Sequence, residues 1–185
     1  MSTKSMKVLV LANEKGGVGK SMFVSQYAYY CAEKLGLKTL VIDLDHQANS
    51  SKALVSSERC HVANVLASQV LADAKTLDMH EPFVLIKADD GLTRLEKNGD
   101  KHGFYAGNLA KVLESASVYY DICIIDTNPN PDIRQITAIV VASHVLSPIQ
   151  LNQEAIDGIG RLFENIKKLK QINKKMVFLG LMPNL

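Results

Sequence analysis

The sequence predicts an α/β fold in three layers, with helices packed on both faces of a mostly parallel, doubly wound sheet. Short apolar runs alternate along the chain with longer amphipathic segments, as in proteins whose parallel strands are connected by helices. The first apolar run, residues 8–12, leads into a glycine-rich turn from which a helix starts. Runs that are apolar at every position indicate strands buried on both faces, so the sheet is expected at the centre of the molecule.

Each element follows from its local pattern. Apolar side chains at every fourth position from Phe23 to Leu35 predict a helix that ends before Gly36. The expected strands lie at residues 8–12, 39–43, 83–86, 122–125, 145–151 and 176–181. The expected helices lie at residues 20–35, 61–74, 104–117, 136–142 and 153–173. The polar, serine-rich segment 47–60 is expected to be a loop, and segment 89–103 has no clear pattern.

Composition limits the class of protein. The 185 residues are 47% hydrophobic and 22% charged, which suits a single domain over residues 1–185. A net charge of +2 neither requires nor excludes a nucleic-acid partner. The three cysteines form no CxxC pair, which favours a reduced, cytoplasmic protein. Because no apolar run approaches the ~20 residues that span a bilayer, we expect no integral membrane association.

A glycine-rich loop, Lys15–Ser21, carries the strongest functional signal. A strand that feeds such a loop at the start of a helix forms an anion site, because backbone N–H groups converge there and the helix end adds partial positive charge. Gly16, Gly17 and Gly19 let the backbone approach a phosphate without a Cβ clash. In this pattern the lysine before the final serine reaches the terminal phosphates, and the serine hydroxyl binds Mg²⁺.

The loop departs from the general pattern GxxxxGKS/T, because Glu14 occupies the position of the first glycine. A glycine-rich turn without a ligand is the alternative interpretation. The strand before the loop and the helix after it favour the phosphate site.

Acidic residues directly follow two of the predicted strands. Asp43 and Asp45 lie at the end of the strand at 39–43, and Asp126 follows the apolar run 122–125. Parallel sheets keep their ligands at the carboxyl ends of the strands, so these acids are expected near the glycine-rich loop. A turn is the favoured explanation of Asp43 and Asp45 taken alone, and it explains Asp126 as well as a metal ligand does. Their order along the chain favours a metal shell and a positioned water.

The run Lys15–Ser21 resembles the deviant Walker A motif of the ParA/MinD ATPases, in which an extra lysine precedes the glycines. Residues 43–47 resemble the switch I motif DxDPQ of that family, with His46 in place of the proline. Asp126 is similar to the Walker B acid, and residues 127–132 are similar to switch II. The resemblance covers nearly the whole chain, points most strongly to ParA/Soj-type partition proteins, and implies a P-loop NTPase fold.

The resemblance implies roles for individual residues in binding and hydrolysing ATP. Lys20 would bind the β- and γ-phosphates and act in catalysis, and Ser21 would bind Mg²⁺. Asp45 would position the attacking water. Asp43 and Asp126 would support the metal.

Lys15 would be the signature lysine of the family, a catalytic group that reaches the nucleotide of a second subunit. This role implies a homodimer that closes on ATP and opens on hydrolysis, so that a slow ATPase acts as a switch. The other nucleotide-binding residues that the resemblance implies are Gly16, Gly17, Val18, Gly19, Met22 and Asn184, the last of which would read adenine.

A partition function implies non-specific DNA binding by the ATP-bound dimer, a ParB-like partner that stimulates hydrolysis, and a cytoplasmic protein that associates with the nucleoid when ATP is bound. Basic residues near the end of the chain could contribute to DNA binding. A solvated helix end that complements the helix dipole is the favoured alternative for them. These residues are Lys167, Lys168, Lys170, Lys174 and Lys175.

Two other functions use the same fold. A MinD-like membrane-positioning ATPase would need a C-terminal amphipathic helix, which we do not find in the sequence. A metabolic ATP-dependent ligase or synthetase would have its own substrate pocket and less need of Lys15. Because Leu185 comes directly after an apolar run, we expect that this chain lacks the C-terminal elements of the family.

Overall fold

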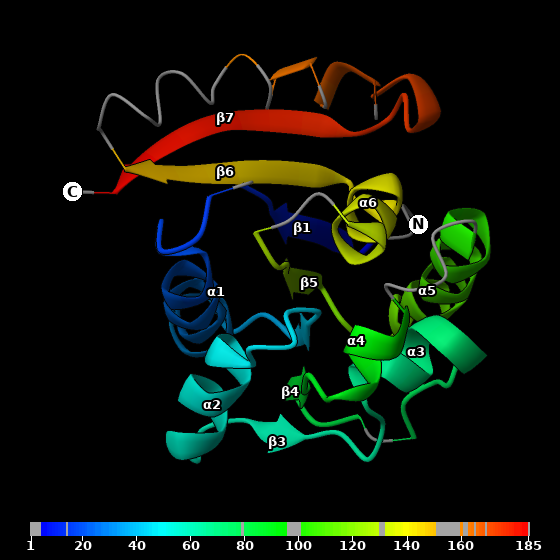
Figure 1. The fold of residues 1–185 in the computed structure, drawn as a ribbon. Coiled ribbons are helices and arrows are strands. Elements are labelled where there is room, and N and C mark those ends of the chain that lie inside the picture. The colour runs from blue at the N-terminus through cyan, green and yellow to red at the C-terminus, as the bar shows by residue number, and fades with distance from the viewer. Residues whose placement is uncertain are drawn as a thin grey trace.

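The computed structural model describes residues 5–13, 15–78, 80–95, 101–129, 132–150, 160, 163–164, 166–168 and 170–184. Within these residues, a seven-stranded sheet runs through the middle of the molecule, and helices cover both of its faces (Figure 1). Every pairing between described strands is parallel, so the predicted fold class is confirmed.

The strands lie side by side in the order β3-β4-β2-β5-β1-β6-β7. The chain therefore starts near the middle of the sheet and extends it toward both edges, which is a doubly wound topology. The strand bounds are β1 Lys7–Leu11, β2 Thr39–Asp43, β3 His61–Val62, β4 Phe83–Ile86, β5 Ile122–Asp126, β6 His144–Gln150 and β7 Val177–Asn184.

The described helices divide between the two faces of the sheet. Helices α1 (Lys20–Tyr29) and α2 (Asn49–Ser56) cover one face, and α3 (Ala67–Asp73), α5 (His102–Ala116) and α6 (Ile133–Val141) cover the other (Figure 1). Two short helical segments are the π-helical turn η1 (Tyr30–Lys34) directly after α1 and the helix α4 (Gly91–Leu95).

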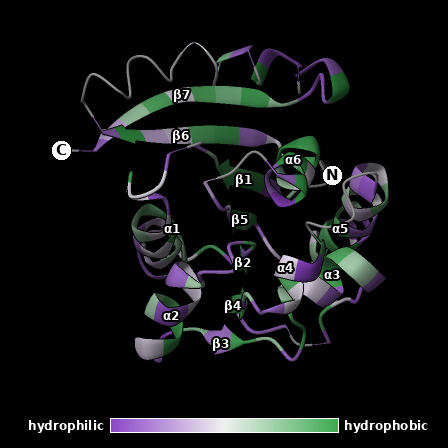
Figure 2. Cartoon of the chain, viewed as in Figure 1, coloured by the Kyte–Doolittle hydropathy of each residue, from purple (hydrophilic) through white to green (hydrophobic). Residues whose placement is uncertain are grey.

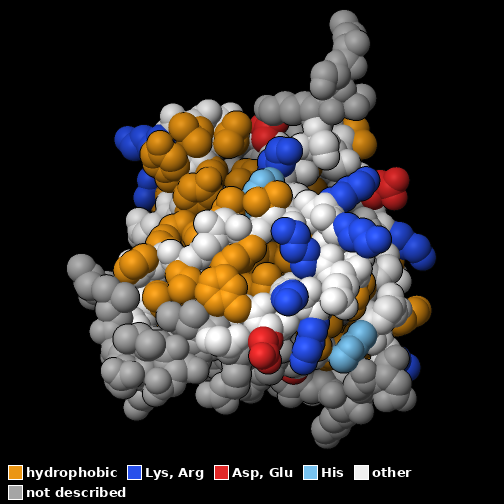
Figure 3. Space-filling model, turned by 90° about the horizontal axis from the view of Figure 1, so that it is seen from above, with side chains coloured by type: hydrophobic (Ala, Val, Ile, Leu, Met, Phe, Trp, Pro, Cys, Tyr) orange, Lys and Arg blue, Asp and Glu red, His pale blue; other side chains and the backbone are white. Residues whose placement is uncertain are grey.

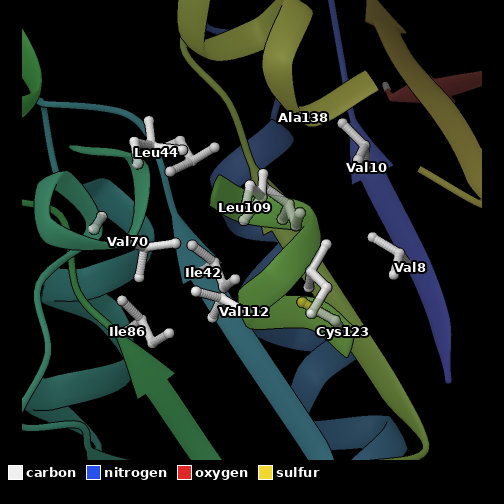
Figure 4. Close-up of a cluster of buried hydrophobic side chains, with 14 of the residues drawn as sticks. Val8, Val10, Ile42, Leu44, Val70, Ile86, Leu109, Val112, Cys123 and Ala138 are labelled. Carbon is white, nitrogen blue, oxygen red and sulfur yellow. The ribbon is translucent and has the colours of Figure 1, made fainter. Parts of the chain in front are cut away.

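Alternation along the buried strands divides the core into two layers. In β1, Val8 and Val10 belong to the layer beneath α3, α5 and α6, whereas Leu9 and Leu11 belong to the layer beneath α1 and α2. Figure 4 shows part of the first layer, where side chains of the strands meet those of the covering helices. In Figure 2 the hydrophobic colour follows the central strands, and hydrophilic residues lie on the outer surfaces of several helices. Because both layers consist of buried, closely packed apolar side chains, the strand ends that carry the polar residues are held in fixed relative positions.

Two segments differ from the predicted elements. Residues 49–56 form helix α2 instead of a loop. The hydroxyls of Ser50 and Ser51 donate to buried carboxylates, so they do not compete for the backbone of their own helix. Residues 61–74, predicted as one helix, divide into strand β3 and helix α3, because His61 and Val62 pair with β4 at the sheet edge.

Glu14 and much of the last predicted helix, 153–173, lie outside the described residues. The part of this helix that is described, between residues 160 and 172, is helical. All five lysines between 167 and 175 are exposed. Seen from the side of β7, apolar side chains gather on the surface with Lys and Arg side chains beside them (Figure 3). Of the helices in the described part of the chain, none is both long enough and apolar enough to cross a membrane.

Candidate functional site

The carboxyl ends of β1, β2 and β5 meet at one edge of the sheet. In the strand register, Asp43 of β2 lies opposite Asp126 of β5. On the other side of β5, Asp126 lies opposite Leu11, the last residue of β1. The glycine-rich loop connects β1 to α1 above this edge. Gly17 and Gly19 have φ angles of 75° and 90°, a left-handed conformation that glycine adopts without steric cost. The local geometry is therefore that of an anion-binding loop at a helix start.

A pocket of about 390 Å³ lies between this loop and two neighbouring ones. The glycine-rich loop lines it with residues 16–22. Asp45, Gln47 and Asn49 line it from the chain after β2, and Pro129 lines it from the chain after β5. The pocket therefore brings together the predicted phosphate-binding loop and the predicted water-positioning acid, although they are far apart in the sequence.

Lys20 is buried beneath the loop, with 6% of its surface exposed. Its Nζ donates to the carbonyl oxygens of Asn13 and Lys15, both at 3.2 Å. Burial lowers the pKa of Lys20, and the nearby carboxylates of Asp126 and Asp45 oppose that effect. These carboxylates stabilise the ammonium group of a lysine that lines the pocket.

Two serines of α2 hold the buried carboxylates. Ser50 Oγ donates to Asp126 Oδ2 at 2.6 Å, and Ser51 donates to Asp43 Oδ2 from Oγ at 2.6 Å and from its backbone N at 2.9 Å. Asp43 Oδ1 accepts from the backbone N of Asp45 at 3.0 Å. Both oxygens of Asp43 are therefore engaged behind the pocket, where they fix the turn that carries Asp45. Burial raises the pKa of Asp43 despite these hydrogen bonds. Its place in a metal shell stays a prediction.

Asp126 differs from Asp43, because one of its oxygens has no partner. Its side chain is fully buried, and within the described ranges no group donates to Oδ1. Burial and then the Asp43 carboxylate raise the pKa of Asp126 to about 7, while hydrogen bonds from Ser21 and Ser50 lower it and Asp45 raises it further.

The surroundings of Asp126 fit a magnesium ion. An unsatisfied carboxylate oxygen close to the Ser21 hydroxyl supplies the oxygen ligands that Mg²⁺ prefers. At nucleotide sites this ion is usually held by one or two side chains together with phosphate oxygens. Among the described residues, no three His, Cys, Asp or Glu side chains lie together in a group that could hold a metal by themselves.

Asp45 lines the pocket and is 5% exposed. Its Oδ1 accepts from the backbone N of Gln47 at 3.0 Å, and its carbonyl accepts from the backbone N of Ala48 at 2.8 Å. This turn presents the carboxylate to the space next to Lys20, where an attacking water would have to be oriented. Its catalytic role stays a prediction.

The last two strands hold the outer side of the glycine-rich loop. Gln150 Nε2 donates to the carbonyl of Gly17 at 3.1 Å, and Asn184 Nδ2 donates to the carbonyl of Val18 at 3.2 Å. Asn184 thus lies beside the loop and outside the pocket lining, as does Lys15. The predicted contacts of Asn184 with adenine and of Lys15 with a second subunit stay predictions.

Sequence reasoning did not identify Asn13, Ser50, Ser51 or Arg134, all of which shape the site. Asn13 orders the start of the loop, because its Oδ1 accepts from the backbone N of Lys15 at 2.8 Å. The one available signal was a polar residue directly after the apolar run 8–12. The serines were hidden in a segment whose composition favours a loop.

The parallel sheet, the glycine-rich loop between β1 and α1, and the acids at neighbouring strand ends together define a P-loop NTPase. A family model described as an AAA domain matches residues 6–178, and the chain belongs to this family. The resemblance to ParA/Soj-type partition proteins is confirmed by its relatives.

Protein IncC of Escherichia coli is 33% identical over 190 residues, covering 98% of this chain and 51% of IncC. The chromosome-partitioning ATPase Soj of Treponema pallidum is 28% identical over 169 residues, covering 89% of this chain and 65% of Soj. Among solved structures, cobyrinic acid a,c-diamide synthase from Mycobacterium smegmatis with a bound ATP analogue and magnesium is 25% identical, with a TM-score of 0.79 over 96% of this chain and 74% of the synthase. The chain thus spans about half the length of the IncC protein that it matches.

Proposed function

We propose that this chain binds ATP with Mg²⁺ and hydrolyses it slowly, as a switch of the ParA/Soj type. The observation that carries the proposal is the meeting of the glycine-rich loop and Lys20 with three carboxylates, those of Asp43, Asp45 and Asp126, at neighbouring strand ends. Soj is named as an ATPase, and the similar synthase holds an ATP analogue with magnesium. Both proteins support ATP as the nucleotide, and the synthase supports Mg²⁺ as its partner ion.

Each residue has a task that its position allows. The backbone N–H groups of the loop cradle the phosphates, and Lys20 neutralises charge on the β- and γ-phosphates. Ser21 and Asp126 hold Mg²⁺, and Asp43 supports them from behind. When bound, Mg²⁺ supplies further charge neutralisation for phosphoryl transfer. Asp45 orients the attacking water.

The switch acts through a second subunit. In this proposal Lys15 reaches the nucleotide of the partner subunit, so that ATP holds two copies together. The dimer then binds DNA non-specifically, with a ParB-like partner stimulating hydrolysis, in the cytoplasm and on the nucleoid. The exposed lysines between 167 and 175 are a candidate contribution to DNA binding, which would weaken as the salt concentration rises.

Substitution of Lys15 by Ala tests this function. Light scattering with a non-hydrolysable ATP analogue and Mg²⁺ measures the mass of the wild type, of Lys15→Ala and of the control Lys34→Ala, which removes an exposed lysine on η1. We expect dimers of the wild type and of the control, and monomers of Lys15→Ala. A Lys15→Ala protein that dimerises like the wild type would contradict the switch.

A metabolic ATP-dependent synthetase is the second candidate, because the similar structure is a synthase with a TM-score of 0.79. Such an enzyme would use the same phosphate site to activate a small-molecule substrate. Unaltered oligomerisation of Lys15→Ala, together with ATP turnover that depends on an added carboxylic acid substrate, would favour it over the partition switch.

A further inference from the structure

Arg134 connects the two chain segments that face the glycine-rich loop. Its side chain is fully buried, and it donates to Asp132 Oδ2 from Nε at 3.1 Å and from Nη2 at 2.6 Å. Its Nη1 lies 3.1 Å from Nδ1 of His46. Asp132 in turn caps the start of α6. The presence of a buried ion pair is weak evidence that the pair stabilises the fold. The position of Arg134 therefore calls for another explanation.

The chemistry of the contact determines the state of His46. A guanidinium group can only donate hydrogen bonds, so Nδ1 of His46 must accept and the ring proton lies on Nε2. The amide nitrogen Nε2 of Gln47 lies 2.8 Å from Nε2 of His46. Because only an acceptor can face the ring proton, we assign the amide in the flipped orientation, with its oxygen at this contact. His46 therefore bridges Arg134 and Gln47.

The two segments that Arg134 joins line the same pocket. The segment after β2 contributes Asp45 and Gln47, and the segment after β5 contributes Pro129. Asn128 Nδ2 donates to Asp132 Oδ2 at 2.6 Å, so the second segment is tied to the carboxylate that holds Arg134. The bridge from α6 to His46 thus links both of these lining segments through one charged group.

We propose that Arg134 is a positioning residue that acts through His46 to lock these two segments together and to fix Asp45. The consequence for turnover rests on the proposed ATP hydrolysis, whereas the lock itself does not. Asp45 is adjacent to His46 in the chain, and its Oδ1 lies 3.7 Å from Nδ1 of His46. Where the family motif has proline, whose ring restricts the backbone, this chain has a histidine held by a buried arginine.

Hydrogen exchange of the nucleotide-free protein tests the lock without any reaction. His46→Leu removes the acceptor, His46→Asn keeps an acceptor near the position of Nδ1, and His61→Leu is a control at a distant, exposed histidine. We expect His46→Leu to raise exchange about tenfold or more both in residues 43–48 and in residues 126–135, as loss of a charge-assisted hydrogen bond implies. His46→Asn should reverse most of this rise, and His61→Leu should change neither segment.

ATP turnover by the same variants tests the consequence for Asp45. We expect His46→Leu to lower kcat about tenfold or more while the Kd for ATP stays within about twofold, and His46→Asn to restore most of kcat. A rise of exchange in residues 43–48 alone would overturn the proposal, as would an equal loss of kcat in both His46 variants. A wild type that never hydrolyses ATP, but whose two segments loosen together in His46→Leu, would refute the proposed function and leave the lock supported.

Discussion

Replacing the Asp126 carboxylate by an amide should stabilise the nucleotide-free protein and impair its function. The pKa of Asp126 is raised to about 7 from 3.8, mainly by burial and next by Asp43. A shift of about three pKa units corresponds to about 4 kcal/mol of unfavourable charge burial at pH 8. An Asn accepts weaker hydrogen bonds from Ser21 and Ser50 than a carboxylate does, which offsets about 1–2 kcal/mol. We therefore expect Asp126→Asn to raise the free energy of unfolding by about 2–3 kcal/mol.

The gain in the free energy of unfolding of Asp126→Asn should depend on pH in a defined direction. Because the folded-state pKa of Asp126 is raised, the native state binds its proton more tightly than the unfolded state between about pH 4 and pH 7. The contribution of Asp126 to stability therefore falls as pH rises through this range and is constant above it. The stability difference between Asp126→Asn and the wild type should grow from about pH 4 to about pH 7 and then level off.

Thermal and urea unfolding without nucleotide, at several pH values between 5 and 8, measure this difference. For a chain of this size the expected gain at pH 8 corresponds to a Tm increase of about 5–10 °C. Asp73→Asn, at an exposed position on α3, is the matched control and should change stability by less than about 0.5 kcal/mol. An Asp126→Asn protein that is no more stable than the wild type at pH 8, or a gain that shrinks with pH, would refute the reasoning.

Three further substitutions test the site. Lys20→Ala should weaken ATP binding about 100-fold or more, because a buried cation facing the phosphates is lost, and isothermal titration measures this. Asp45→Ala should keep the Kd for ATP within about threefold but lower kcat about 100-fold or more, and normal turnover would contradict its role. Gly19→Ala should destabilise the fold by about 1–3 kcal/mol and impair ATP binding, because its φ is 90° and a Cβ would lie 2.5 Å from Asn184 Nδ2. Gly36→Ala is its control, with a φ of 63° and open space around the Cβ, and should leave ATP binding unchanged.

The central strands could be predicted from the sequence because a strand buried on both faces is apolar at nearly every position. The run Thr39–Asp43 is a strand over the predicted residues, and the predicted strand at 122–125 extends by one residue to Asp126. The two-residue strand β3 could not be predicted, because exposed His61 and Val62 carry no such pattern and pair only where the edge of β4 is available. Residues at a sheet edge depend on a neighbour that lies far away in the sequence.

The phosphate loop and the acids were likewise predictable, because their spacing and order reflect chemistry at strand ends. The supporting residues were not, since their importance arises only from tertiary contacts. Ser51 is an ordinary polar residue in the sequence, yet it donates to Asp43 and also accepts from the backbone N of Ala88 at 3.0 Å. Arg134 is buried where the chain after β5 supplies Asp132 and the chain after β2 supplies His46 as its partners. Such second partners cannot be inferred from the spacing of residues along the chain.

The electrostatics of the pocket explain why a cationic ligand would control the two segments beside it. Asp43 and Asp126 are held close together behind the pocket, and burial raises the pKa of each. A divalent cation at Oδ1 of Asp126 would favour the ionised form of this carboxylate. The favourable interaction between the cation and the carboxylate would then stabilise the ligated state, whereas the empty site would lack it. Because Asp43 fixes the turn of Asp45, and Ser50 of α2 holds Asp126, this change in charge would act on the segment that carries Asp45, the residue proposed to orient water. A site that is destabilised when empty can therefore convert nucleotide binding into a change of conformation, whereas a site of neutral side chains would bind without that response.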